Sequence, residues 1–371
     1  MKKITSTNIQ KIFFLGLFFA IGSQVNAQES EQSKIESVVA NLNISGSIDT
    51  YFRTNFNALN KYEYNNEGDI IANPQAPASS FANDPGFAIG MANVILSYEG
   101  GKVGFVADLV FGPRGEVAVF ASAAPSNIVN QLYAYWNVSK AVTLTLGNFN
   151  TFLGYEVISP ATNFNYSTSY MFSYGPFSHT GIKADFSIAH HWSAALAIMN
   201  PTDWTEFNPY GKYSFGGQLG YSTDSGSAYL NILYGEQIPL SDKATFQIDL
   251  TTGWNLTEAF YLGLNTTYNT TDGEGFYGAA FYPQFQTSST FAIGIRAEYF
   301  KELEDGGPVY GADAQSLNFT LTGNYTIGSL TLKPELRLDK VSNTPEPVFI
   351  DKDLQRQDNL SSFVLAAIYA F

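Results

Sequence analysis

Apolar and polar residues alternate with a period of two along most of the chain, and this pattern limits the possible folds more than any other feature. In one such segment Val103, Phe105 and Leu109 share a face, while Asp108 lies on the other. Side chains two residues apart point to the same face of a β-strand. The alternation recurs from about residue 41 to the end of the chain. It predicts about sixteen strands, each with one apolar and one polar face.

The connections between the predicted strands alternate between short and long. Seven are short, as at 139–141, and eight are long or irregular, as at 57–86, 151–177 and 270–275. Short turns at one end and long loops at the other are typical of outer-membrane barrels. The predicted fold class is therefore all-β, a transmembrane antiparallel up-and-down β-barrel of about 16 strands over residues 41–371. Its short turns would be periplasmic and its long loops extracellular.

The alternative is a soluble all-β protein such as a sandwich or a propeller. Charged residues make up only 14% of the chain, compared with ~25% in a typical soluble domain. The apolar faces of about sixteen strands together form more surface than one protein interior could bury. The polar faces carry too few charges for the surface of a soluble protein. A barrel with its apolar face toward lipid and its polar face toward water explains both observations.

The N-terminal segment has the three parts of a secretory signal peptide. Three lysines precede an apolar run of about ten residues, and small residues then lead up to Ala27. A membrane-anchoring helix is the alternative, but the run is shorter than the ~20 residues that span a bilayer. We therefore predict a signal peptide at 1–27, a polar periplasmic leader at 28–40 and a location in the bacterial outer membrane.

Charge and cysteine content exclude several kinds of partner and site. The three lysines are the only charges in 1–27, so 16 basic and 33 acidic residues remain, with a formal net charge of −17. This acidity argues against binding to nucleic acid and against docking on an anionic membrane surface. The absence of cysteine excludes disulfide frameworks, thiolate metal sites and cysteine nucleophiles.

Charges on the polar faces predict the lining of a pore. A barrel of sixteen strands encloses an aqueous channel, whereas eight strands would be filled by side chains. Arg or Lys facing lipid at mid-bilayer would cost roughly 2–4 kcal/mol, but a water-filled pore would keep such charges hydrated. The predicted pore-lining residues are Asp49, Arg53, Asp108, Lys183, Asp185, Asp249, Arg296, Glu298, Lys333, Glu335, Arg337 and Asp339.

Four of these residues, Lys333, Glu335, Arg337 and Asp339, alternate in sign along one strand. They could create a transverse field that orients polar solutes, or they could form structural ion pairs in the barrel wall. The acidic net charge weakly favours cations, because acid-lined pores attract them.

Catalytic, metal and cofactor sites are not predicted. Two of the three histidines, His190 and His191, fall in a predicted short turn, and no Ser–His or Asp–His motif accompanies the third. Acidic pieces such as 302–305 and 351–353 do not match the twelve-residue calcium loop and are better explained as solvated loops. We therefore expect no enzymatic activity, no cofactor and no metal.

Three stretches between residues 146 and 181 are distinctive. They are Leu146–Glu156, which ends in Leu-Gly-Tyr-Glu, the Asn/Tyr/Ser segment Asn163–Ser169, and Gly175–Gly181 with the sequence Gly-Pro-Phe-Ser-His-Thr-Gly. Together they resemble the OmpL-like family of β-barrel porins, which is common in the Bacteroidota. The resemblance covers most of the chain after residue 27 and implies an outer-membrane channel, but it supplies no particular solute.

Resemblance to general porins also implies that the 151–177 loop could fold into the lumen and narrow it. Glu156 and His179 would then be constriction candidates. An ordinary surface loop is the alternative for this segment. His179 could equally be a hydrogen-bonded structural residue.

The last strand alternates up to a terminal aromatic residue, with Phe363, Leu365, Tyr369 and Phe371 on one face. By resemblance to other barrel proteins, this ending implies that the outer-membrane assembly machinery is a partner. Outer-membrane lipid and small hydrophilic solutes are the other expected partners, and either a homotrimer or a monomer fits the sequence. The leading hypothesis is a porin for passive diffusion of small hydrophilic solutes or ions. A substrate-selective uptake channel and a non-conducting surface-binding barrel are the alternatives.

Overall fold

The computed structural model describes residues 40–119, 122–237 and 241–371. The predicted signal peptide and nearly all of the predicted leader lie outside the described residues. The barrel forms one compact unit, Asn43–Phe371. Among the described residues, no helix is long and apolar enough to cross a membrane.

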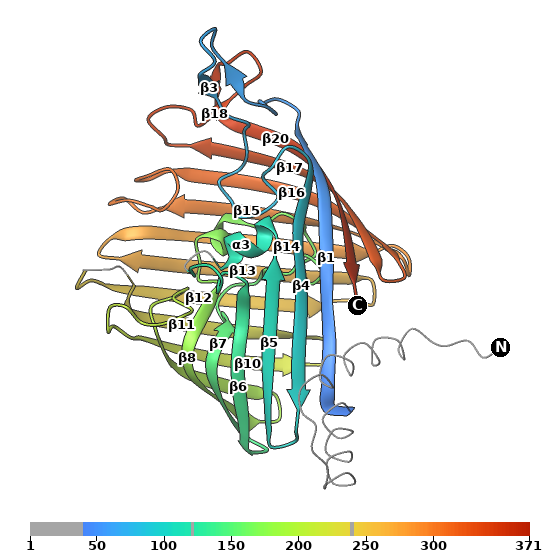
Figure 1. Ribbon diagram of the computed structural model, residues 1–371, viewed down its shortest axis with the longest axis vertical. Coiled ribbons are helices and arrows are strands. Elements are labelled where there is room, and N and C mark those ends of the chain that lie inside the picture. The colour runs from blue at the N-terminus through green and yellow to red at the C-terminus, as the bar shows by residue number, and fades with distance from the viewer. Residues whose placement is uncertain (1–39, 120–121, 238–240) are drawn as a thin grey trace, which may run out of the picture. The chain divides into compact units, whose positions relative to one another are not determined.

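In the described part of the chain, sixteen strands pair antiparallel into one closed barrel (Figure 1). These strands are β1 (Leu42–Asn55), β4 (Gly86–Glu99), β5 (Val103–Phe111), β6 (Val129–Ser139), β7 (Val142–Asn150), β8 (Ser178–Ala189), β9 (Trp192–Met199), β10 (Ser214–Thr223), β11 (Gly226–Glu236), β12 (Ala244–Asn255), β13 (Phe260–Thr271), β14 (Glu274–Gln286), β15 (Phe291–Glu302), β16 (Gln315–Ile327), β17 (Leu330–Ser342) and β20 (Asn359–Ala370). The predicted fold and strand number are confirmed.

Neighbouring barrel strands follow one another along the chain, and the first and last strands close the ring. Ser47 of β1 lies opposite Ala370 of β20, and Asn55 lies opposite Ser362. Closure leaves no strand edge unpaired, which is a requirement for backbone that crosses a bilayer. The hydrogen-bonded wall therefore provides the constraint that disulfides would otherwise supply.

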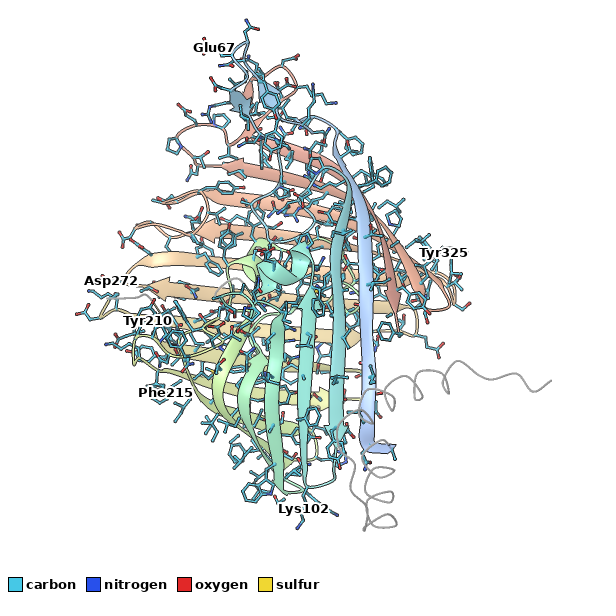
Figure 2. The ribbon with its side chains drawn as sticks, viewed as in Figure 1. Glu67, Lys102, Tyr210, Phe215, Asp272 and Tyr325 are labelled. Atoms are coloured by element: carbon cyan, nitrogen blue, oxygen red, sulfur yellow. The ribbon has the colours of Figure 1, made fainter. Side chains whose placement is uncertain are left out.

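The two faces of each strand follow the alternation in the sequence. On β16, Leu317 and Phe319 are 45% and 44% exposed, whereas Asn318 and Thr320, which alternate with them, are fully buried. Figure 2 shows Tyr325 of the same strand at the outer margin of the barrel. The exposed apolar side chains form the face that lipid covers, because in solution so large an apolar surface would be unfavourable.

The two ends of the barrel differ in the length of their connections. In the described residues, the short turns fall where the sequence predicts them, for example between β6 and β7 and between β8 and β9. The 270–275 connection, expected to be long or irregular, is instead a two-residue turn at Asp272 and Gly273, with φ of 53° and 94°. Two consecutive positive φ values define a type I′ turn, which suits Asp-Gly and the twist of a hairpin.

Short elements lie within the long connections. They are β2 (Glu63–Tyr64), β3 (Ile70–Ala72), α3 (Pro113–Ala118), α4 (Tyr170–Ser173), β18 (Phe349–Ile350) and β19 (Arg356–Gln357). Of these, α3 and α4 contribute directly to the site described next.

Candidate functional site

The 151–177 segment, which we call the inner loop, leaves β7 and returns to β8. In this loop only Ala161 and Thr162 are exposed, and most of its residues between 163 and 172 are fully buried. A loop on an outer surface would expose most of its side chains. The inner loop instead makes its polar contacts with the inward-facing side chains of β1, β12 and β15–β17.

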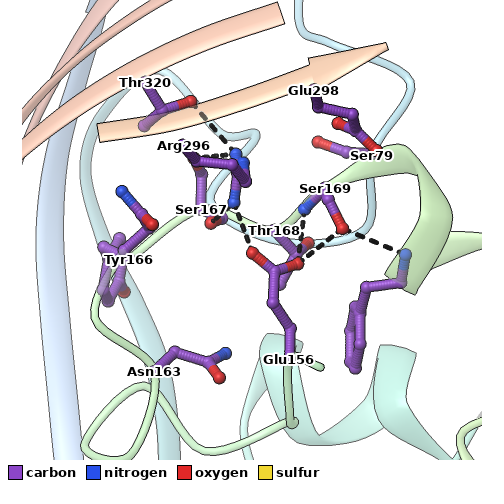
Figure 3. A network of polar contacts seen from close by, with 12 residues as sticks. Ser79, Glu156, Asn163, Tyr166, Ser167, Thr168, Ser169, Arg296, Glu298 and Thr320 are labelled. Atoms are coloured by element: carbon purple, nitrogen blue, oxygen red, sulfur yellow. Dashed lines mark hydrogen bonds and ion pairs between the residues drawn. The ribbon is translucent and has the colours of Figure 1, made fainter. Parts of the chain in front are cut away.

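A buried ion pair lies at the centre of these contacts (Figure 3). Nη1 of Arg296 on β15 is 2.6 Å from Oε1 of Glu156 in the inner loop, and both side chains are almost completely buried. The same nitrogen donates to the carbonyl of Ser167 at 2.6 Å, and Nη2 donates to the hydroxyl of Thr320 at 3.1 Å. These bonds offset the large cost of removing a guanidinium from water.

Two wall carboxylates bind backbone N–H groups of the inner loop. Glu298 on β15 accepts hydrogen bonds from Tyr170 at 3.0 Å and Met171 at 2.9 Å, at the start of α4. Glu335 on β17 accepts from two consecutive loop residues, Tyr166 at 2.8 Å and the next residue at 3.1 Å. Hydrogen bonds to an ionised acceptor are roughly twice as strong as neutral ones. These carboxylates therefore act as anchors for the loop.

The basic residues of the same wall bind loop carbonyls. Lys333 donates from Nζ to Pro160 at 2.9 Å and also to Asn163. Arg337 forms a buried ion pair with Asp339 at 2.7 Å and donates to a carbonyl of the inner loop at 2.9 Å. The geometry of Arg337 and Asp339 therefore favours structural ion pairs in the barrel wall as the explanation of the alternating charges on β17.

Aspartates on β1 and β12 complete the attachment of the loop. The hydroxyl of Tyr166 donates to Asp49 at 2.5 Å, and the backbone N–H of Gly154 donates to Asp249 at 2.9 Å. The inner loop is therefore held near its start and along its buried central part.

The other four predicted pore-lining residues make different contacts. Arg53 donates to a carbonyl in the connection between β1 and β4, and Asp108 accepts from Asn130 within the wall. Lys183 and Asp185 on β8 pair with each other at 3.0 Å, with 22% and 40% of their side chains exposed. These two residues are accessible to water, in contrast to the rest of the predicted set.

The expectation that the predicted lining charges stay hydrated is wrong for ten of the twelve residues. They are Asp49, Arg53, Asp108, Asp249, Arg296, Glu298, Lys333, Glu335, Arg337 and Asp339, all buried. Groups of the inner loop, of neighbouring strands and of other connections occupy the hydrogen-bonding positions that water would take in an open pore.

Glu156 and His179 do not share one environment. Glu156 binds Arg296, whereas His179 is fully buried beside the first residue of the inner loop. Its Nε2 lies 2.9 Å from the hydroxyl of Thr151, and its ring contacts Phe149 and Phe152. These contacts favour the structural interpretation of His179.

The sequence did not single out Arg114, on α3 in the connection between β5 and β6. Its guanidinium donates to the carbonyls of Ile158 at 2.9 Å and Tyr166 at 3.2 Å, and it lies 4.4 Å from the ring centre of Phe81. Parity along strands cannot identify a residue in a loop, so no sequence signal marked this contact. Arg114 therefore adds a contact from α3 to those that the inner loop makes with the barrel strands.

Asp203, in the connection between β9 and β10, ties another loop to the end of the inner loop. It accepts hydrogen bonds from the N–H groups of Phe177 and Ser178, both at 2.8 Å. Burial raises the pKa of Asp203 to about 6 from its usual value of 3.8. Because the folded protein then binds this proton more tightly than the unfolded chain does, stability should fall as the pH rises from 4 to about 6.

The Asp203→Asn variant keeps an acceptor oxygen but cannot ionise, so it should lose this part of the pH dependence. Urea unfolding of the barrel in detergent micelles at pH 4, 5, 6 and 7 would measure how the free energy of unfolding depends on pH. An identical pH slope in the variant and the parent chain would contradict the assignment.

No group of three or more His, Asp or Glu side chains in the described residues is placed to hold a metal ion.

Comparisons with known proteins agree with the geometry. A family model described as "Putative beta-barrel porin-2, OmpL-like" matches residues 41–371. A search of curated proteins found no significant match.

Three solved bacterial structures illustrate the similar fold. An anion-selective porin from Comamonas acidovorans is 11% identical and covers 89% of this chain and 99% of its own, with a TM-score of 0.56. OprB from Pseudomonas putida is 11% identical over 93% of this chain and 97% of its own, with a TM-score of 0.55. A trimer form of the outer-membrane protein OmpT from Vibrio cholerae is 10% identical over 89% and 99%, with a TM-score of 0.52. At these identities the likeness shows the fold alone.

Proposed function

The chain belongs to the OmpL-like beta-barrel porin-2 family and is an outer-membrane porin for passive diffusion, and from this premise we propose that the inner loop sets the width of its aqueous path. Family and fold are those of a channel rather than an enzyme. The polar contacts of the loop with β1, β12 and β15–β17 support the proposal, because they hold the loop inside the ring of strands.

Small hydrophilic solutes or ions then pass on the β8 side of the loop, beside Lys183 and Asp185. The observation that carries this proposal is their exposure, since ten other charged residues predicted to line the pore are buried. Charges that remain in contact with water inside a narrow channel act directly on a passing ion.

Charge reversal at this wall provides the test. In planar bilayers with a salt gradient, Lys183→Glu should shift the reversal potential toward cation preference and Asp185→Lys should shift it toward anions. The matched control is Lys340→Glu, because Lys340 lies on the outward parity of β17 and is exposed. Absence of current steps from the folded parent chain would refute a conducting pore. Equal reversal potentials for all three variants would refute the path beside Lys183.

The assembly partners follow from the same premise. We propose that the assembly machinery recognises β20, which closes the barrel against β1 and leads to the terminal Phe371. A homotrimer and a monomer both remain proposals, and the trimer form of one structural neighbour supports the first. Light scattering of the detergent-solubilised protein distinguishes the two.

A further inference from the structure

A cavity of about 700 Å³ lies at the short-turn end of the barrel. One side is formed by wall residues near three short turns, including Asn255, Gln286 and Thr331. The other side is the inner loop between Tyr155 and Phe164. Cavities that bind small molecules commonly have volumes of roughly 300–1,000 Å³. The inner loop thus covers a chamber of suitable size that a diffusing solute would enter.

The polar groups of this cavity are almost entirely uncharged. Among the described residues that line it, only Glu258 and Lys333 carry a charge. Lys333 is buried and donates to two loop carbonyls, and Glu258 is exposed in the turn between β12 and β13. The neutral hydrogen-bonding side chains that the wall contributes include Asn255, Gln284, Gln286, Asn324, Thr326 and Thr331.

Aromatic rings of the inner loop sit against glycines of the wall. A Cβ atom at Gly263 would lie 2.5 Å from the hydroxyl of Tyr155, and one at Gly294 would lie 2.6 Å from a ring carbon of Phe164. A side chain at either position would collide with the ring, so glycine permits the close approach. Tyr155 also stacks on Tyr282, with ring centres 4.2 Å apart and an angle of 18°. The rings are therefore held in fixed positions at the cavity.

We propose that this cavity binds a neutral polyhydroxylated solute, of the saccharide class, during its passage through the porin. Amide and hydroxyl side chains can both donate to and accept from sugar hydroxyls. Fixed aromatic rings offer apolar surface to the C–H faces of a sugar. A charged solute would find no exposed opposite charge in the chamber apart from Glu258 at the turn. The inference rests on the proposed diffusion function and names a solute class for the short-turn end of the same lumen, on its β12–β17 side.

Binding can be measured without transport. The mature chain, folded in detergent micelles, is titrated calorimetrically with glucose and maltotriose, and with gluconate and glucosamine as charged relatives of glucose. We expect saturable binding of the neutral sugars and at least tenfold weaker binding of both charged ones. Binding of gluconate as tight as that of glucose would overturn the proposal, as would the absence of saturable binding of either neutral sugar.

Variants locate the binding to the cavity. Gln284→Leu combined with Thr331→Val removes neutral hydrogen-bonding groups with little change in size and should weaken maltotriose binding at least tenfold. The matched control is Thr143→Val, which removes an inward hydroxyl of β7 outside the lining. Equal affinity for maltotriose in the double variant and in Thr143→Val would overturn the assignment of the binding site to this cavity. If the double variant does not fold, the comparison of neutral and charged ligands on the parent chain still tests the proposed preference for neutral sugars.

Bilayer recordings separate this inference from the proposed function. A chain that conducts, but whose current maltotriose does not reduce from either side, would overturn the saccharide site and leave the porin intact. A chain that binds maltotriose in micelles but gives no current steps would refute conduction and retain the site.

Discussion

Deletion of residues 157–174 should raise the single-channel conductance several-fold. The deleted segment contains the backbone groups that bind Glu298 and Glu335 and lies inside the ring of strands. Without it, water would reach the charged wall of β15–β17, which is now covered. The backbones of the barrel strands are hydrogen-bonded to one another, so we expect the channel to widen while the wall persists. Current steps in planar bilayers at high salt would measure the change.

A deletion of similar kind in an outer loop provides the control. Residues 205–211, between β9 and β10, are largely exposed, and their removal should leave the conductance close to that of the parent chain. Heat-dependent mobility of both variants on gels would show that each barrel has folded. Unchanged conductance after removal of 157–174 would refute a constriction there.

Strand parity predicted the inward face of the charged residues that the barrel strands contribute to the candidate site, because side-chain direction in a strand is a local property. Arg296 and Glu335 were assigned inward from their spacing alone, and both are inward and buried. The Asp272–Gly273 turn carried a local signal too, since Asp-Gly is the preferred type I′ pair. The alternation of connection lengths predicts a long or irregular segment at this position, and the local Asp-Gly preference prevails.

What these charges bind could not be predicted from the sequence. Glu298 and Glu335 accept hydrogen bonds from backbone N–H groups. Every non-proline residue of a loop has such a group, so no residue type in the sequence identifies the partner. The role of Arg114 is equally difficult to predict from the sequence, because its acceptors are the backbone carbonyls of Ile158 and Tyr166. The scarcity of charges in the inner loop is consistent with this arrangement. The wall supplies the ionised groups, and the loop supplies its backbone dipoles and Glu156.

Replacement of Arg296 by methionine should destabilise the barrel more than any other single change at this site. Glu156 would keep two hydrogen bonds from Ser169, both 2.7 Å long, but its charge would be buried without a counter-ion. Breaking a buried ion pair in this way typically costs about 3–5 kcal/mol. We expect a loss of that size in the free energy of unfolding in urea. The freed loop should also become sensitive to chymotrypsin, which cleaves beside aromatic residues such as Tyr166.

A second substitution shows whether the charge itself causes the loss. Glu156→Gln combined with Arg296→Met removes both charges of the pair, so the double variant should recover part of the stability that Arg296→Met loses. Lys301→Met, on the same strand, breaks a partly exposed pair with Asp313 at 3.2 Å and should cost no more than about 1 kcal/mol. If Arg296→Met is no more harmful than Lys301→Met, the ion pair with Glu156 does not hold the inner loop. The attachment would then depend on the carboxylate anchors Glu298 and Glu335.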